Sequence, residues 1–114
     1  MTIIAPSVLS LDFTKLEEQM NALKASKAEY LHFDVMDGIF VPNISFGIPV
    51  LASIRPATKM VCDAHLMITE PIRYVEDFKK AGADLITIHL EACEDVQATI
   101  DKIHEMGVKA GLSI

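Results

Sequence analysis

Tryptophan is absent from this sequence of 114 residues, and cysteine occurs only twice, as Cys62 and Cys93. Two cysteines cannot build the disulfide framework of a small secreted domain, so we expect a reduced chain in which both are small buried apolar side chains. The first residues, MTIIAPSVLSLDF, also lack the positively charged region of a secretory signal. These absences favour a cytoplasmic protein.

Positive charge is scarce as well, because 10 lysines and arginines stand against 16 aspartates and glutamates. The net charge of −6 excludes an extended basic surface, so we expect neither nucleic acid nor anionic lipid as a partner. No stretch approaches the roughly 18 consecutive apolar residues of a membrane helix, so we expect no membrane partner either.

Apolar residues are abundant by contrast, at 51% of the chain. A mean hydropathy of +0.33 excludes a disordered chain. A chain of this length buries only about two-thirds of its surface on folding, so one small core does not account for so apolar a composition. We therefore expect a homo-oligomer, or a chain that is part of a larger unit.

Strand-like and helix-like segments alternate along the sequence. The helical stripes run from Phe13 to Leu23, from Pro49 to Ile54, from Ile72 to Phe78 and from Val96 to Ile103. The strand-like segments are nearly continuous apolar runs, as in a parallel sheet covered on both faces. These segments are Ile3–Leu9, Tyr30–Met36, Met60–Met67, Leu85–Leu90 and Lys109–Ile114. The alternation predicts an α/β fold.

The repeat length separates two α/β architectures. The expected strands begin about 26 residues apart, and eight such units need roughly 210 residues, the lower end of a (β/α)8 barrel. An open, doubly wound sheet of five strands also fits the length. However, no glycine-rich phosphate turn follows the first expected strand, where Pro6–Ser10 stands instead. The pattern favours the barrel, with four units and one further strand present.

Chemically active side chains fall at the ends of two neighbouring expected strands. Alternation places His32, Asp34 and Met36 on one face of the first strand. The next strand ends in Asp63-Ala64-His65-Leu66-Met67, which again places a histidine two residues before a methionine. The carboxyl ends of barrel strands are where active sites lie, so His32, Asp34 and His65 are expected at one level.

Two histidines and one carboxylate are a suitable ligand set for zinc, iron or manganese. Three other interpretations remain open. His32 and Asp34 could form a simple buried hydrogen bond with His65 unrelated to it, and His89 could join the cluster or donate to a neighbouring carboxylate. The same residues also describe the facial triad of a metal-dependent oxygenase, although that site is expected on an antiparallel sheet.

Several motifs resemble one known family. They are Ala5–Ser10 (APSVLS), His32–Asn43 (HFDVMDGIFVPN), Asp63–Met67 (DAHLM), Ala81–Asp84 (AGAD) and His89–Glu91 (HLE). Together they closely resemble the ribulose-phosphate 3-epimerase family over essentially the whole chain. The resemblance implies a (β/α)8 barrel of the ribulose-phosphate-binding type with one divalent metal ion (zinc, iron, manganese or cobalt) and no organic cofactor. It also implies interconversion of D-ribulose 5-phosphate and D-xylulose 5-phosphate, a reaction of the pentose phosphate pathway.

The resemblance also assigns roles to individual residues. It implies that His32, Asp34 and His65 ligate the metal and that Asp34 is the catalytic proton acceptor and donor on one face of the sugar phosphate. Ser7 and His65 are implied to contact the substrate. Met36 and Met67 are implied to line its pocket.

The same resemblance makes residues 1–114 the N-terminal half of a single barrel domain. It places a fourth ligand, an aspartate that is the second acid–base group, and the phosphate-binding loops beyond Ile114. Two further hypotheses stay open. The chain could belong to an epimerase of a six-carbon ketose phosphate such as allulose 6-phosphate, or it could be an inactive half-barrel that serves only as an assembly unit.

Overall fold

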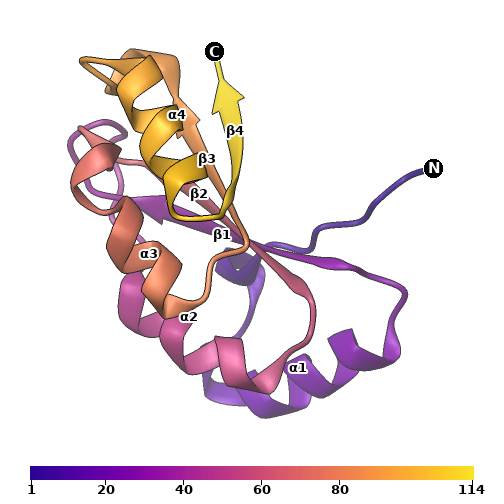
Figure 1. The fold of residues 1–114 in the computed structure, drawn as a ribbon. Coiled ribbons are helices and arrows are strands. Elements are labelled where there is room, and N and C mark those ends of the chain that lie inside the picture. Colours follow the sequence, from indigo (N-terminus) through magenta and orange to yellow (C-terminus); the bar gives the residue numbers. More distant parts are fainter.

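The computed structural model describes all 114 residues and contains one parallel sheet with the strand order β1-β2-β3-β4 (Figure 1). The strands are β1 (Tyr30–Met36), β2 (Val61–Met67), β3 (Leu85–His89) and β4 (Lys109–Ser113). The α-helices are α1 (Leu16–Ala25), α2 (Ile48–Ile54), α3 (Val75–Ala81) and α4 (Val96–Glu105). A helix lies in every connection between strands, as parallel strands require. The α/β class and the alternation predicted from the sequence are confirmed.

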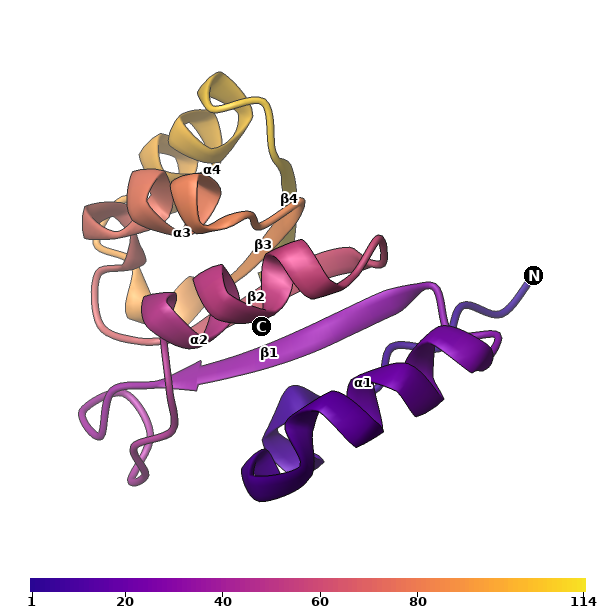
Figure 2. The ribbon, with the colours of Figure 1, turned by 90° about the horizontal axis from the view of Figure 1, so that it is seen from below.

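The strand order also separates the two architectures. A doubly wound sheet reverses its strand order at a switch point, whereas here each strand lies beside the next one in the chain. The strands fan out strongly, so that β1 and β4 point in different directions (Figure 1). The helices follow in chain order from α1 beside β1 to α4 beside β4 (Figure 2). This arrangement is consistent with part of a (β/α)8 barrel.

The expected strand over Ile3–Leu9 is wrong in extent. This segment lies alongside β1, where the backbone N–H groups of Tyr30 and His32 donate to the carbonyl groups of Ile4 and Pro6. It forms only a single parallel bridge, between Ser7 and His32. Pro6 has no N–H to donate, and β1 is the only strand beside the segment. After Ser7 the chain turns into a short 3-10 helix, Val8–Ser10.

The two faces of the sheet differ sharply. Leu31, Phe33 and Val35 of β1 are buried, while the residues between them are only half-buried, and β3 shows the same alternation. The buried side chains join those of the helices in one core of 19 residues, which includes Met20, Leu51, Val75 and Ile103. Helices therefore cover one face, and the other face carries the polar residues of the strands.

Helix ends are set by local hydrogen bonds and by two glycines. Asp12 and Asp95 each accept a backbone N–H at the start of a helical segment, and Gly82 and Gly107 end α3 and α4 with positive φ angles.

The helices are short, and α1 and α4 contain only 10 residues each. None of the helices combines the length and the apolar character needed to cross a membrane.

Candidate metal centre

The register between β1 and β2 brings the candidate ligands together. His32 lies opposite Asp63, and Asp34 lies opposite His65, in a parallel pairing without a shift. Side chains of a strand alternate between its two faces, so these residues share the face that the helices do not cover. The half-buried His32, Asp34 and His65 therefore meet near the carboxyl ends of the strands.

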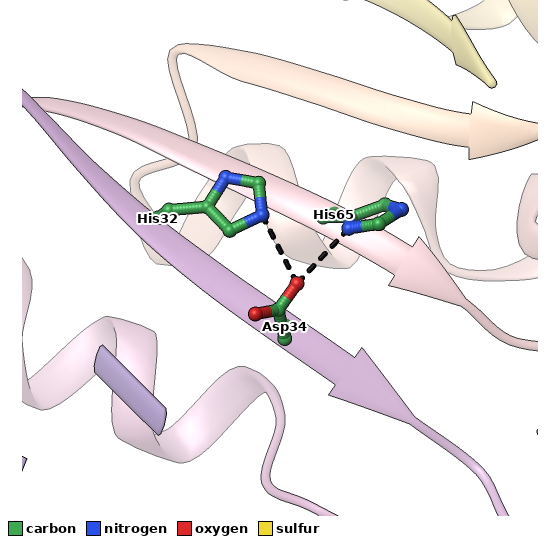
Figure 3. Close-up of side chains that lie close together, drawn as sticks. All are labelled: His32, Asp34 and His65. Atoms are coloured by element: carbon green, nitrogen blue, oxygen red, sulfur yellow. Dashed lines mark hydrogen bonds and ion pairs between the residues drawn. The ribbon is translucent and has the colours of Figure 1, made fainter. Parts of the chain in front are cut away.

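One carboxylate oxygen is the centre of this group (Figure 3). Asp34 Oδ1 lies 3.0 Å from His32 Nε2 and 2.9 Å from His65 Nδ1. One ligand atom from each of the three residues lies within 4.8 Å of the others. The donor set fits a divalent metal ion, because imidazole nitrogen and carboxylate oxygen both bind zinc, iron and manganese. An ion held by these three residues would take the place of the hydrogen bonds that the two histidine nitrogens now make with Asp34.

Each histidine also contacts a second group through its other ring nitrogen. His32 Nδ1 lies 2.7 Å from Asp63 Oδ2, and His65 Nε2 lies 2.7 Å from His89 Nε2. His89 Nδ1 in turn lies 3.8 Å from a carboxylate oxygen of Glu91. His89 thus does join the cluster, and it also faces a neighbouring carboxylate.

The two outer contacts shift histidine pKa values in opposite directions. The hydrogen bond to Asp63 raises the pKa of His32 above its ordinary value, against the opposing effect of burial, and the charges of Asp63 and Asp34 add to the rise. Burial lowers the pKa of His89, and the neighbouring His65 lowers it further. Without a metal, His32 is therefore suited to carry a positive charge between two carboxylates, whereas His89 is suited to stay neutral.

The remaining residues named from the sequence lie around this group. Ser7 donates a hydrogen bond from its hydroxyl to Asp34 Oδ2 at 3.3 Å, which ties the amino-terminal segment to the site. Met36 and Met67 end β1 and β2 as a half-buried pair in register. Alternation places both methionines on the same face as Asp34 and His65.

The loop after β1 is organised by Asp37, whose role the sequence did not suggest. Its carboxylate accepts the backbone N–H groups of Ile39 and Phe40 in its own loop and of Thr69 after β2. Burial acts to raise the pKa of Asp37, but these three N–H groups hold it below its ordinary value. Gly38 follows with a φ of +75°, and a Cβ there would lie 2.8 Å from the side chain of Ile44. The loop is therefore fastened to the carboxyl ends of both strands.

Sequence reasoning also missed Asp63 as a partner of the site. Alternation places Asp63 on the same face as His65, and on that face its contact is with His32 on the neighbouring strand. The available signal was the equal spacing of two pairs, because an unshifted register that sets Asp34 beside His65 also sets His32 beside Asp63.

Comparison with known proteins adds a family to this geometry. The model of the ribulose-phosphate 3 epimerase family matches residues 3–114. A ribulose-phosphate 3-epimerase from Synechocystis sp. is 50% identical over 111 residues, which cover 96% of this chain and 48% of that protein. A ribulose-phosphate 3-epimerase from Bacillus subtilis is 47% identical over 112 residues, which cover 98% of this chain and 52% of that protein.

A plant relative extends the comparison. The chloroplastic ribulose-5-phosphate-3-epimerase of Arabidopsis thaliana is 45% identical over 112 residues, which cover 96% of this chain and 40% of that protein. The chain thus spans about half the length of the curated relatives it matches. The family match over almost all of its residues shows that this chain belongs to the ribulose-phosphate 3-epimerase family.

Proposed function

We propose that residues 1–114 form the N-terminal half of a single (β/α)8 barrel domain. The complete barrel interconverts D-ribulose 5-phosphate and D-xylulose 5-phosphate with the help of one divalent metal ion and no organic cofactor. The observation that carries this proposal is the convergence of His32, Asp34 and His65 on one face of the sheet, in a chain that belongs to this family. The reaction belongs to cytoplasmic sugar metabolism, in the pentose phosphate pathway.

Asp34 is the proton carrier in this proposal. Epimerisation at the carbon beside a ketone removes a proton from one face and returns one from the opposite face. Asp34 is held in place by two histidine nitrogens at its Oδ1 and by the hydroxyl of Ser7 at its Oδ2. A carboxylate fixed in this way can accept the C3 proton on its face of the substrate and later return one there. The carrier on the other face belongs to the second half of the barrel.

His32 and His65 hold the metal together with Asp34. When bound, the ion supplies Lewis-acid stabilisation of the negative charge that develops on the substrate as the proton leaves. His65 and Ser7 also contact the substrate, while Met36 and Met67 line its pocket. Methionine side chains exclude water and offer no strong competing hydrogen-bond donor, which strengthens the electrostatic interactions in the site.

Two other functions stay open, an epimerase of another sugar phosphate and an inactive half-barrel. The same residues suit a six-carbon ketose phosphate such as allulose 6-phosphate, because none of them selects the length of the sugar. A half-barrel that serves only as an assembly unit would keep the fold and lose the chemistry. The oxygenase alternative is disfavoured, because the observed sheet is parallel and covered by helices.

The decisive experiment follows the C3 proton. The complete barrel, loaded with Mn²⁺, is mixed with ribulose 5-phosphate in deuterated water, and deuterium at C3 is measured by NMR. We expect exchange together with formation of xylulose 5-phosphate, and loss of both after chelation. Faster exchange with allulose 6-phosphate would support the six-carbon alternative. Absence of exchange with either sugar would contradict the proposed function.

We also propose that this chain associates with further copies of itself. The polar face of the sheet has no helix on it, and apolar side chains such as Ile39, Ile44 and Leu112 are exposed. Sedimentation of the 114-residue chain at micromolar concentration tests the proposal. We expect dimers or larger species, and a monomer that unfolds cooperatively would contradict it.

A further inference from the structure

We propose that Asp63 is a positioning residue of the candidate metal centre, one that fixes the orientation and the protonated nitrogen of His32. The inference rests on the metal site of the proposed function and adds to it a residue that is neither a ligand nor in contact with substrate. The observation behind it is the 2.7 Å contact between Asp63 Oδ2 and His32 Nδ1 across β1 and β2.

The hydrogen-bonding chemistry of the two groups determines where the proton is. An ionised carboxylate only accepts hydrogen bonds, so His32 Nδ1 must carry the hydrogen in this contact. With the hydrogen on Nδ1 fixed in this way, the nitrogen of His32 that becomes free when a cation binds is Nε2, which faces Asp34 at 3.0 Å. The side chain of Asp63 is only 11% exposed, so water competes little for its oxygens. His32 is therefore prepared to offer Nε2 to a cation.

Asp63 is itself held by the next strands of the sheet. The hydroxyl of Thr87 on β3 donates to Asp63 Oδ1 at 3.4 Å, so both oxygens of the carboxylate are used. Thr87 lies opposite Gly111 of β4, where a Cβ would approach the Thr87 hydroxyl to 2.5 Å. Only glycine at this position leaves the Thr87 side chain its space. A row of contacts thus runs from β4 through β3 and β2 to a ligand on β1.

The support of His65 is of a different kind. Its partner outside the ligand group is His89, a second imidazole at 2.7 Å, backed by Glu91 at 3.8 Å. Glu91 is 56% exposed, so solvent weakens that contact. An imidazole whose only charged partner is this exposed carboxylate constrains its neighbour less than a buried carboxylate with both oxygens engaged. We therefore expect removal of Asp63 to weaken metal binding more than removal of His89.

The test is a titration of this chain with Co²⁺, followed by the visible absorption of the bound ion. We expect Asp63→Ala to weaken binding by about 10- to 100-fold, the usual effect of losing a partner of a metal-ligating histidine. Asp63→Asn should lose less of the Co²⁺ affinity, because an amide oxygen still accepts a hydrogen bond from His32 Nδ1. The Co²⁺ affinity of His89→Ala should lie between that of Asp63→Asn and that of the unchanged chain. Asp101→Asn, an exposed carboxylate on α4, is the matched control and should bind like the unchanged chain.

A second measurement separates positioning from a merely structural role. In the Zn²⁺-loaded chain, the His32 Nδ1–H proton should give a downfield, slowly exchanging NMR signal, which Asp63→Ala should abolish. A structural role alone would lower the urea midpoint and leave this signal and the affinity of the folded chain unchanged. Gly111→Ala would displace the Thr87 hydroxyl that donates to Asp63, while Asp63 itself is unchanged. We expect this variant to bind Co²⁺ a few-fold more weakly.

The outcomes distinguish this inference from the proposed function. If the unchanged chain binds Co²⁺ and a folded Asp63→Ala variant binds it equally well, Asp63 does not position His32, and the metal site itself stands. If His32→Ala has no effect on the absorption of bound Co²⁺, the metal site of the proposed function is wrong. Circular dichroism of each variant shows which of them fold. If Asp63→Ala does not fold, the Co²⁺ affinity and the His32 Nδ1–H signal of Gly111→Ala decide whether Asp63 positions His32.

Discussion

The two ends of the sheet use charged groups in opposite ways. At the amino ends of the strands, Arg55 donates to the carbonyl groups of Gly82, Thr58 and Met60 and to the carboxylate of Asp84. At the carboxyl ends, two histidines compete for one oxygen of Asp34. Each contact of Arg55 is with a different acceptor oxygen. In contrast, His32 and His65 both contact the same oxygen of Asp34.

This difference indicates what each end is for. Arg55 closes the connections that lead into β2 and β3, and Asp84 also accepts the backbone N–H of Cys62, so the group is complete without a ligand. The histidine group would gain an attractive partner from a cation, because its nitrogens and oxygen all point at one small region. The contacts of Arg55 hold the fold at one end, whereas the contacts at the other end surround a position that a cation could occupy.

The largest effect is expected at the carboxyl end, where Asp34→Asn should lower the rate of proton exchange. An amide of the same shape reaches the metal weakly and cannot accept the substrate proton, so exchange at C3 by the complete barrel should fall by about 10²- to 10⁴-fold. The fold should be unchanged by circular dichroism. Exchange at a near-normal rate would mean that another residue is the base.

Arg55→Met tests the amino end and should act on stability alone. Loss of hydrogen bonds from a charged group should lower the free energy of unfolding by about 2–3 kcal/mol, measured with urea. The matched control is Arg73→Met, because Arg73 is exposed and also donates to backbone carbonyl groups. We expect a loss of less than about 1 kcal/mol for the control. A change in Co²⁺ affinity in the folded Arg55→Met chain would contradict the separation of the two ends.

Cys62 makes the amino end sensitive to alkaline pH. Burial raises the pKa of its thiol from 9.0 to about 11, with Arg55 opposing and Asp84 adding to the rise. Because the folded-state pKa is the higher one, the stabilisation is complete below pH 9 and is lost as the pH rises through 11. The free energy of unfolding should fall by about 1.4 kcal/mol per pH unit in this window. Cys62→Ala should remove most of that slope, and an unchanged slope would contradict the assignment.

The smallest effect belongs to an ion pair at neither end. Lys80 lies 3.2 Å from Glu76 on the exposed side of α3. Solvent screens such a pair, so Lys80→Ala should change the free energy of unfolding by no more than about 0.5 kcal/mol. A change as large as that of Arg55→Met would show that any charged contact stabilises this fold equally, and not the multiple hydrogen bonds of Arg55 in particular.

The sequence predicted the repeating elements well because their signals are local. Apolar spacing placed α2 and α4 to within a few residues, and alternation placed His32 and Asp34 on one face of β1. The first expected strand was wrong in extent, because a strand also depends on the neighbours that pair with it. The spacing of Thr14 and Glu17 also suits a capping box, yet it is Asp12 that accepts the Thr14 N–H.

Contacts between distant residues could not be predicted in the same way. Arg55 meets Asp84 across 29 residues, and His32 meets Asp63 across 31. The first pair has no sequence spacing that marks it, and the second is marked only once the register that sets Asp34 beside His65 is known, because each depends on how the crossover between two strands returns the chain to the sheet.

By itself the sequence determined which side chains share a face, because alternation along a strand is a property of the extended backbone. The tertiary structure decided the register. A slip of one residue between β1 and β2 would turn His65 and Asp63 away from Asp34 and His32 and towards the helices. The buried face of each strand opposes that slip, because its apolar side chains would then face solvent. The candidate metal centre therefore depends on the packing of the opposite face of the same sheet.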